Sequence, residues 1–388
     1  MYPLSCFVLF FSAWAVAAGS LLRNSSTYLW DLGLPSEEHE VITEDGYILR
    51  IFRIPKHGAT PVIFMHGFLG TSDMWLLMER DSNLATILAD NGYDVWIANM
   101  RGNMHSHRHI LLSSAPNNFE YWNFSIDEIA KKDLPAIMNH ITTNTGKQKM
   151  FYIGHSMGST AFFILCSENP QICEQFHTAV LLAPIAFPPE RVRLQTVDAF
   201  VQWGSVLADM LRRINVYEFL GSNQPIIRLF QISCASDLFI CRAILQLLFG
   251  FDKGNSLLHP LSDHVTSSFG GTSVKVFDHI SRIIAREGTL GPYDSISTPQ
   301  KIYRSSIEYK LENIEVPIGL VSGADDIFVD EKAMNKLRPK LKKIMFDVVI
   351  PGPFKHLGYF YEVKNNYQMV SEILNLLKDF SYRSNSLI

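Results

Sequence analysis

An apolar stretch that ends abruptly in Gly154-His155-Ser156-Met157-Gly158 constrains the fold of this chain more than any other feature. A buried strand followed by Gly-x-Ser-x-Gly and then by a helix is the pattern of a nucleophile elbow. The two glycines fit a tight strand-to-helix turn, because side chains would collide there. The turn would expose the serine hydroxyl at a helix N-terminus, where the Met157 N–H group can face developing negative charge. The pattern therefore predicts a nucleophilic serine at the edge of a sheet, with an ordinary β–α turn as the alternative.

The chain has 388 residues, of which 47% are hydrophobic, enough for one large catalytic domain with an insertion or for two domains. Its formal net charge is −4 and its basic residues are scattered. Nucleic-acid binding requires a basic stripe or patch, so we expect no nucleic-acid partner.

Residues 1–19 have the pattern of a signal peptide, with an apolar core at Phe7–Phe11 and small residues from Ala13 onward. A membrane anchor would require about 20 uninterrupted apolar residues, and this run is shorter. We therefore expect secretion and no transmembrane segment. Two sequons, at Asn24 and Asn123, are glycosylation candidates, and we expect the second to be buried at a helix start.

Four cysteines follow the predicted signal peptide as two local pairs. In an oxidising compartment such pairs are candidates for disulfides. We expect a bridge between Cys234 and Cys241. The pairing of Cys166 with Cys173 stays open, because Cys166 lies on the apolar face of the predicted helix and is equally a core thiol.

Strand and helix signals alternate along most of the chain. The predicted strands are a hairpin over Glu40–Ile54 turning at Asp45-Gly46, then Pro61–Met65, Tyr93–Ala98, the elbow strand, Thr178–Pro184, a strand after Val316 and Phe346–Ile350. The predicted helices are Asp81–Asn91, a capped helix from Ser125 towards Asn144 with a kink at Pro135, one after Ser156, one from Asp330 and a closing helix over Glu362–Phe380. This alternation predicts an α/β fold with a mostly parallel central sheet and helices on both faces.

The alternation stops between residues 185 and 312, where strand signals disappear and amphipathic segments take over. We expect a mainly helical cap inserted over the active end of the sheet, which leaves 20–184 and 313–388 as the core. The most apolar piece, Leu229–Phe251, contains Asp237, Arg242 and Gln246, which would be costly in lipid. A cap helix over an apolar pocket explains it better than a membrane span.

The loop that follows Pro61–Met65 is His66-Gly67-Phe68. In α/β-hydrolases the loop after the third strand donates one backbone N–H group to the oxyanion hole. We therefore expect the N–H groups of Phe68 and Met157 to form that hole. The alternative is a glycine-rich turn that only links strand to helix.

The partners of the serine follow from chain order, which in this fold runs nucleophile, acid, histidine. His356 is the only histidine after the Val316 strand. The acid should end that same strand, and we favour Asp326 over Asp325 and Asp330. His356 would act as the base for Ser156, and Asp326 would hold the imidazole, so that ester hydrolysis proceeds through an acyl-serine.

Three histidines at alternate positions, His105, His107 and His109, could share one face of a strand as metal ligands do. They enter a polar loop with no acidic or cysteine partner nearby in the sequence, so we expect no metal site and no other cofactor. Arg101 is expected to anchor this loop through an ion pair.

Several short motifs together resemble the acid lipase family of gastric and lysosomal lipases and their insect relatives. They are Leu34–His39, Thr43–Ile48, His66–Gly67, Gly92–Trp96, Arg101–Asn103, Tyr121–Ser125, Asp127–Glu128, Asp133–Ala136 and Gly154–Ser156. The resemblance covers nearly the whole mature chain and implies a cap over an α/β-hydrolase core, a triad at Ser156, Asp326 and His356, and neutral lipid esters as substrates. It also matches Cys234 and Cys241 approximately to a cap disulfide of that family. Met157, Gly358 and Phe249 depart from the family pattern without touching the triad.

These features predict a secreted triacylglycerol lipase that works at a lipid–water interface, with the lysosome as another possible location. A carboxylesterase or sterol-ester hydrolase would use the same chemistry. A catalytically silent lipid carrier would retain the fold, and the triad argues against it. Nothing in the sequence indicates a protein partner.

Overall fold

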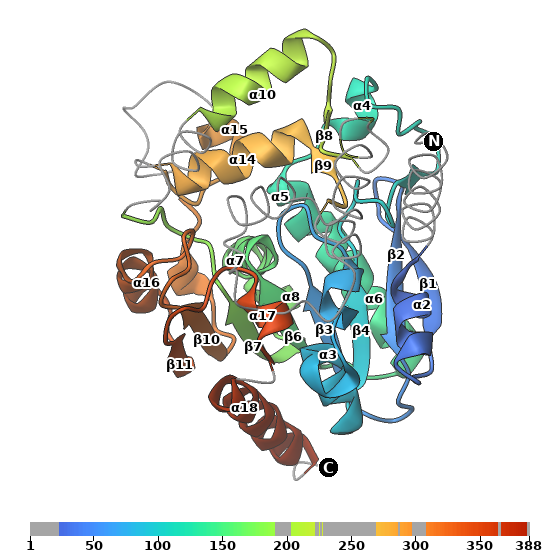
Figure 1. Cartoon of the computed structure of the whole chain (residues 1–388), viewed down its shortest axis with the longest axis vertical. Coiled ribbons are helices and arrows are strands. Elements are labelled where there is room, and N and C mark those ends of the chain that lie inside the picture. The colour runs from blue at the N-terminus through green and yellow to red at the C-terminus, as the bar shows by residue number, and fades with distance from the viewer. Residues whose placement is uncertain are drawn as a thin grey trace, which may run out of the picture.

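The computed structural model describes residues 23–190, 203–221, 225, 227, 269–285, 288–296, 308–363 and 366–385 (Figure 1). The predicted signal peptide, the segment Leu229–Phe251, and Cys234 and Cys241 lie outside these residues. In the part of the chain that is described, no helix has both the length and the apolar character needed to cross a membrane.

A nine-stranded sheet forms the centre of the molecule, in the order β1-β2-β4-β3-β6-β7-β10-β11, with β5 paired to β2. Its strands are β1 (Glu37–Ile42), β2 (Tyr47–Ile54), β3 (Pro61–Met65), β4 (Asp94–Ala98), β5 (Arg108–His109), β6 (Met150–His155), β7 (Phe176–Leu182), β10 (Ile318–Gly323) and β11 (Ile344–Ile350). The pairs of β2 with β1, β4 and β5 are antiparallel, and the other pairs, from β4 to β11, are parallel. The predicted hairpin and the mostly parallel sheet are thus confirmed.

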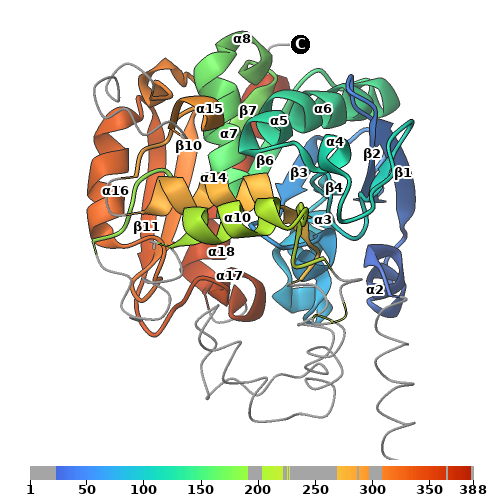
Figure 2. The ribbon, with the colours of Figure 1, turned by 90° about the horizontal axis from the view of Figure 1, so that it is seen from above.

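Helices cover both faces of the sheet, with α3 and α18 on one face and α6 and α7 on the other (Figure 2). The helices of the core are α2 (Ser25–Asp31), α3 (Leu84–Asp90), α4 (Phe119–Trp122), α5 (Ile126–Glu128), α6 (Leu134–Thr145), α7 (Met157–Glu168), α8 (Pro170–Cys173), α16 (Glu331–Leu337), α17 (Gly358–Tyr361) and α18 (Tyr367–Asn385). The strands β3, β4 and β6 are buried along their whole length, in agreement with their mainly apolar sequences.

Two predicted helices differ from those observed. The capping box of Ser125 and Glu128 is present, but a π-helical turn, Ile129–Asp133, separates α5 from α6. This turn ends two residues before Pro135, which has no N–H group for a regular helical bond. The closing helix begins at Tyr367 rather than at Glu362, after the separate short helix α17.

The described part of the predicted insertion contains α10 (Gly204–Arg213), α14 (Val274–Ile284) and α15 (Tyr293–Ile296). It also contains two short strands, β8 (Glu218–Phe219) and β9 (Thr272–Ser273), which pair antiparallel. The expectation that strands disappear here was therefore wrong. Strands of two residues are too short to produce an alternating pattern, so the sequence carries no signal for them.

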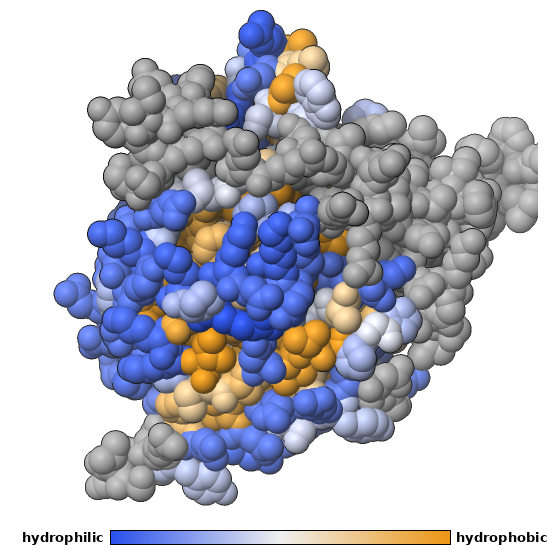
Figure 3. Space-filling view, turned by 90° about the vertical axis from the view of Figure 1, so that its left-hand side faces the viewer, coloured by the Kyte–Doolittle hydropathy of each residue, from blue (hydrophilic) through white to orange (hydrophobic). Residues whose placement is uncertain are grey.

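β11 is the last strand of the sheet and borders the side of the molecule shown in Figure 3, where hydrophobic side chains are exposed within a mainly hydrophilic surface. Met345 and Val349 of β11 are exposed. Lys342 and Lys343 stand just before the strand and form ion pairs with Glu315. Charges beside an exposed edge strand oppose pairing with another chain.

Arg101 is fully buried and joins three segments that are distant in the sequence. Its guanidinium donates to Asp45 Oδ2 and to Asp133 Oδ1, each at 2.7 Å, and lies 4.0 Å from the centre of the Tyr47 ring. Although burial raises the pKa of Asp45, the Arg101 guanidinium outweighs it and holds that pKa well below its usual range. The ion pair expected of Arg101 is confirmed.

Replacing Arg101 by methionine should lower the free energy of unfolding by about 3–5 kcal/mol, because the buried Asp133 carboxylate would lose its charged partner. Chemical denaturation of the wild type and the variant measures this loss. Arg80→Met is the control, because Arg80 pairs with Asp90 at the surface, where solvent screening leaves such a pair little effect on stability. Equal losses in the two variants would contradict a central structural role for Arg101.

Candidate active site

Ser156 stands between the end of β6 and the start of α7, in a backbone conformation that few non-glycine residues adopt, with φ +54° and ψ −116°. The flanking glycines are required by close contact. A Cβ atom on Gly158 would lie 2.6 Å from the carbonyl oxygen of Met65, and one on Gly154 would lie 2.9 Å from the carbonyl carbon of Gly158. Gly154, His155, Ser156, Met157 and Gly158 therefore form the sharp turn that the sequence predicted.

His356 and Asp326 lie in a hydrogen-bonded row with Ser156. His356 Nε2 is 2.9 Å from Ser156 Oγ, and His356 Nδ1 is 2.8 Å from Asp326 Oδ2 and 3.0 Å from Asp326 Oδ1. All three residues are buried. Asp326 follows β10 and His356 follows β11, so the ends of neighbouring parallel strands bring them to the same edge of the sheet as the serine.

The three candidate carboxylates have different surroundings. Asp326 Oδ1 also accepts from the N–H groups of Phe328 and Val329, at 2.9 and 3.2 Å, which holds the carboxylate in place. Asp330 caps α16 through the Ala333 N–H group at 2.9 Å. Asp325 lies next to Gly352, where an added Cβ atom would be 2.4 Å from its Oδ2 atom. Only Asp326 among the three has a described hydrogen bond to His356.

Of the two expected oxyanion donors, Met157 belongs to the elbow and Phe68 belongs to the loop that packs against it. Met157 is the first residue of α7, so its N–H group has no partner within the helix. Gly67 packs directly against the elbow, since a Cβ atom there would be 2.9 Å from the Cβ atom of Ser156. Among the described residues, no group accepts a hydrogen bond from the Phe68 N–H.

His66 has a role that the sequence reasoning missed. Its Nδ1 atom lies 2.8 Å from the Gly67 carbonyl oxygen, and its Nε2 atom accepts from the Met100 N–H group at 3.1 Å. The carbonyl accepts only if Nδ1 carries the proton, so the ring is neutral. In a trans peptide the C=O and N–H groups point in opposite directions. Holding the Gly67 carbonyl therefore constrains the direction of the Phe68 N–H group.

Burial, assisted by the neighbouring His105, lowers the pKa of His66 to about 4, against the opposing effects of the bond to Gly67 and the charge of Asp73. The unfolded chain takes up a proton near pH 6.5, whereas the folded chain does so only near pH 4. Stability contributed by neutral His66 is therefore complete above pH 6.5 and is lost as the pH falls towards 4.

His66→Asn should make stability less dependent on pH between 7 and 4, because asparagine can donate to the Gly67 carbonyl but cannot take up a proton. The difference in the pKa of His66 between the unfolded and the folded chain corresponds to about 3 kcal/mol of folding stability over this pH interval. Urea unfolding of both proteins at several pH values measures the two slopes. Equal slopes would show that His66 is not the buried neutral group described above.

His155 supports the opposite side of the proposed triad. Its Nε2 atom donates to the backbone carbonyl of His356 at 2.8 Å, and the two rings lie 4.9 Å apart. Burial holds the pKa of His155 well below its usual value, so this ring stays neutral. The elbow residue thus fixes the backbone of the histidine that faces Ser156.

The alternating histidines point to different partners. His105 contacts Asp73 at 2.7 Å, His107 contacts Glu218 at 3.3 Å, and His109 contacts the Asp45 carbonyl oxygen at 2.7 Å. The sequence next to these histidines shows no acidic partner, and the folded chain supplies Asp73 and Glu218 from remote segments. Among the described residues, no cluster of histidine, cysteine or carboxylate side chains has the arrangement of a metal site.

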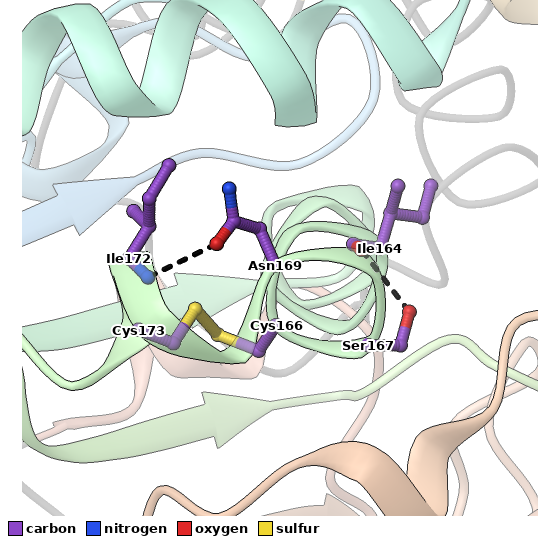
Figure 4. The surroundings of a disulfide bond; sticks show 6 residues. All are labelled: Ile164, Cys166, Ser167, Asn169, Ile172 and Cys173. Carbon is purple, nitrogen blue, oxygen red and sulfur yellow. Dashed lines mark hydrogen bonds between the residues drawn. A yellow bond between two sulfur atoms is a disulfide. The ribbon is translucent and has the colours of Figure 1, made fainter.

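Cys166 and Cys173 form a disulfide that joins the end of α7 to α8 (Figure 4). Asn169 lies between them and caps α8, because its side chain accepts from the Ile172 N–H group at 3.2 Å. The question left open by the sequence is thereby answered in favour of a bridge.

The two sequons have different surroundings, and one of them differs from expectation. Asn24 caps α2 and its amide donates to Glu38 Oε1 at 3.0 Å. The expectation that Asn123 is buried was wrong: Asn123 is exposed, and its Oδ1 atom accepts from Lys275 Nζ at 3.2 Å. The reason is local, because Phe124 and Ser125, which directly precede the helix, are buried, whereas Asn123 is exposed.

Comparison with known proteins agrees with this site. Residues 25–79 match the family model described as a partial alpha/beta-hydrolase lipase region, and residues 60–209 match the alpha/beta hydrolase fold. The chain is 31% identical to gastric triacylglycerol lipase of Rattus norvegicus over 92% of each chain. It belongs to the acid lipase family. It is also 31% identical to the human gastric enzyme, over 92% of this chain and 91% of that protein.

The fold of this acid lipase family member is also found in solved structures of low sequence identity. A putative lipase from Sulfolobus solfataricus aligns with a TM-score of 0.58 at 13% identity, over 89% of this chain and 94% of that one. At that identity the likeness shows the α/β-hydrolase fold alone.

Proposed function

We propose that this member of the acid lipase family is a secreted serine lipase that hydrolyses the ester bonds of neutral lipids, triacylglycerols above all. The observation that carries the proposal is the row of hydrogen bonds from Ser156 through His356 to Asp326. The names of the gastric triacylglycerol lipases it resembles support this substrate class.

The proposed reaction begins when Ser156 Oγ forms a bond to the ester carbonyl carbon while its proton passes to His356 Nε2. Negative charge then develops on the carbonyl oxygen, where the N–H groups of Phe68 and Met157 stabilise it. The C–O bond to the glyceride breaks, and the imidazolium returns its proton to the departing oxygen. Water, activated by His356 in the same way, releases the fatty acid from the acyl-serine.

Asp326 stabilises the imidazolium and holds the His356 tautomer with the proton on Nδ1. The N–H groups of Phe328 and Val329 fix the carboxylate that does this. A neutral His356 is required before each attack, because only the unprotonated Nε2 atom can accept the serine proton.

The domain division follows from the sheet. We propose a core of 20–184 and 313–388 and a cap of 185–312, since none of the described residues between β7 and β10 belongs to a strand of the central sheet. In Figure 1, α10 and α14 extend across one end of the sheet. An apolar cap in this place would cover a long acyl chain and present it to the serine.

We also propose secretion, with residues 1–19 as the signal peptide. The Cys166–Cys173 disulfide supports an oxidising compartment. Asn24 and Asn123 remain glycosylation candidates, and Cys234 and Cys241 remain a candidate second bridge.

Purified wild-type protein should hydrolyse an emulsified long-chain triglyceride faster than a dissolved short-chain ester at equal ester concentration. Fatty-acid release followed by titration between pH 4 and 9 measures both activities. Hydrolysis of the dissolved ester alone would favour a carboxylesterase, and preference for a sterol ester in the same emulsion would favour a sterol-ester hydrolase. No hydrolysis of any ester would contradict the proposal and favour a lipid carrier.

A further inference from the structure

The proposed oxyanion loop belongs to a second hydrophobic cluster, separate from the main core. The buried members of this cluster are Leu69, Ala208, Phe219, Ile227, Phe269, Val274 and Phe277. Leu69 comes from the loop after β3, and the others come from the segment between β7 and β10. Phe68 packs against the same cluster. The loop that would carry the oxyanion donor is therefore held partly by the inserted segment.

The contact with Phe68 is aromatic and well defined. The rings of Phe219 and Phe277 stack with their centres 4.0 Å apart and their planes 3° apart. The Phe68 ring lies 6.1 Å from Phe219 and 6.2 Å from Phe277, inclined by 29° and 27°. Phe219 and Phe277 are 6% and 1% exposed, so the pair forms a fixed surface against which Phe68 rests.

The backbone makes a second link between the two segments. The Gly270 N–H group donates to the Leu69 carbonyl at 2.7 Å, and the Met104 N–H group donates to the Gly270 carbonyl at 2.6 Å. A Cβ atom on Gly270 would lie 2.9 Å from the Gly70 carbonyl oxygen, so glycine permits this approach. Leu69 itself has φ +62°, a conformation that persists only where the surroundings enforce it.

The core holds the same loop from the other side. The Gly67 carbonyl accepts from His66 Nδ1 at 2.8 Å and from the Gly70 N–H group at 3.1 Å. The core thus fixes the Gly67–Phe68 peptide through its carbonyl, and the inserted segment fixes Phe68 through its side chain. Neither set of contacts alone determines where the Phe68 N–H group points.

We propose that Phe219 and Phe277 are positioning residues for the oxyanion hole, which they serve by holding the Phe68 side chain. The inference rests on the proposed function, because it concerns the same hydrolytic site. It adds that the segment between β7 and β10 helps to build the catalytic centre as well as to cover it. Disturbing this aromatic stack should therefore reduce turnover before it reduces substrate binding.

Kinetics on a dissolved short-chain ester test the proposal. Phe277→Ala should lower kcat by about 10- to 100-fold, part of the 10²- to 10³-fold effect of losing one oxyanion donor, and should leave KM within about twofold. Ile280→Ala is the control, because Ile280 lies on the same helix, is 5% exposed and belongs to the main core. Phe277→Leu, which keeps most of the apolar volume, provides a second variant if the alanine variant does not fold.

A double-mutant cycle separates positioning from general loss of stability. Phe68→Ala keeps the backbone N–H group but removes the side chain through which Phe277 would act. If Phe277 acts through Phe68, the double variant Phe68→Ala/Phe277→Ala should have nearly the same kcat as either single variant. The proposal would be overturned if the fold losses in kcat of the two single variants multiplied in the double variant. It would also be overturned if Phe277→Ala had the same kcat as Ile280→Ala.

Hydrogen exchange gives a readout that does not depend on activity. The amides of residues 67–70 should exchange faster in Phe277→Ala than in the wild type or in Ile280→Ala. If the wild type hydrolyses no ester, the proposed function fails, and exchange alone then decides whether the inserted segment holds the loop. Unchanged exchange in Phe277→Ala would refute that coupling.

Discussion

Replacing Ser156 by alanine should lower kcat for ester hydrolysis by about 10⁴- to 10⁶-fold, because no other group can form the acyl intermediate. Ser156 Oγ is 2.9 Å from His356 Nε2, close enough to transfer its proton directly. The substitution removes one oxygen atom and leaves the strained turn in place. Initial rates on a dissolved ester, with enzyme concentration raised for the variant, measure the loss.

Ser167→Ala is the matched control for this substitution. Ser167 is also buried and lies on α7, but its hydroxyl donates to the Ile164 carbonyl at 3.1 Å, away from His356. We expect Ser167→Ala to keep its activity within a few fold of the wild type. An active Ser156→Ala enzyme, at more than about one hundredth of the wild-type rate, would contradict an acyl-serine mechanism.

Asp326→Asn should lower kcat by about 10⁴-fold, because the amide would favour the wrong tautomer of His356 and could not stabilise the imidazolium. The carboxylate lies 2.8 Å from His356 Nδ1, whereas Asp330 caps a helix and Asp325 has no described bond to that ring. Rates of Asp326→Asn at several pH values, with thermal unfolding to check the fold, measure the effect.

Asp325→Asn provides the comparison for Asp326→Asn, because it makes the same chemical change one residue away. It should keep kcat within about tenfold of the wild type, since it leaves both bonds of His356 intact. A larger loss from Asp325→Asn than from Asp326→Asn would show that Asp325, and not Asp326, is the carboxylate that orients His356. Comparable losses from both would mean that the loop after β10 acts as a unit.

The fold and the row of three residues could be predicted because their signals are local. The elbow is five consecutive residues, and the positions of Asp326 and His356 follow from strand order, since neighbouring parallel strands end at the same edge of the sheet. The apolar runs of β3 and β6 likewise predict buried strands from only a few residues.

Contacts between remote segments could not be predicted in this way. Asp73 and Glu218, which lie 32 and 111 residues from their histidine partners, form no pattern that a single sequence reveals. The hydrogen bond from His66 to Gly67 depends on a ring orientation set by Met100. The stack of Phe219 and Phe277 against Phe68 depends on how the inserted segment returns to the core.

The direction of side chains near the start of a helix was a second feature that the sequence could not predict. The sequence around Asn123 placed a capping box correctly at Ser125 and Glu128, but did not show that the preceding asparagine faces solvent. The bridge between Cys166 and Cys173 was equally undetermined, because spacing alone cannot separate a short disulfide loop from two core thiols.

Covalent labelling by a long-chain alkyl organophosphonate tests the central claim most directly, since such a reagent reacts with an activated serine and not with an ordinary hydroxyl. Folded wild-type protein should gain one adduct, which peptide mass spectrometry should place on Ser156. Ser156→Ala should gain none, and Ser167→Ala should be labelled as the wild type is. Folded wild-type protein that stays unlabelled, or that carries the adduct on another residue, would contradict the assignment of Ser156 as the nucleophile.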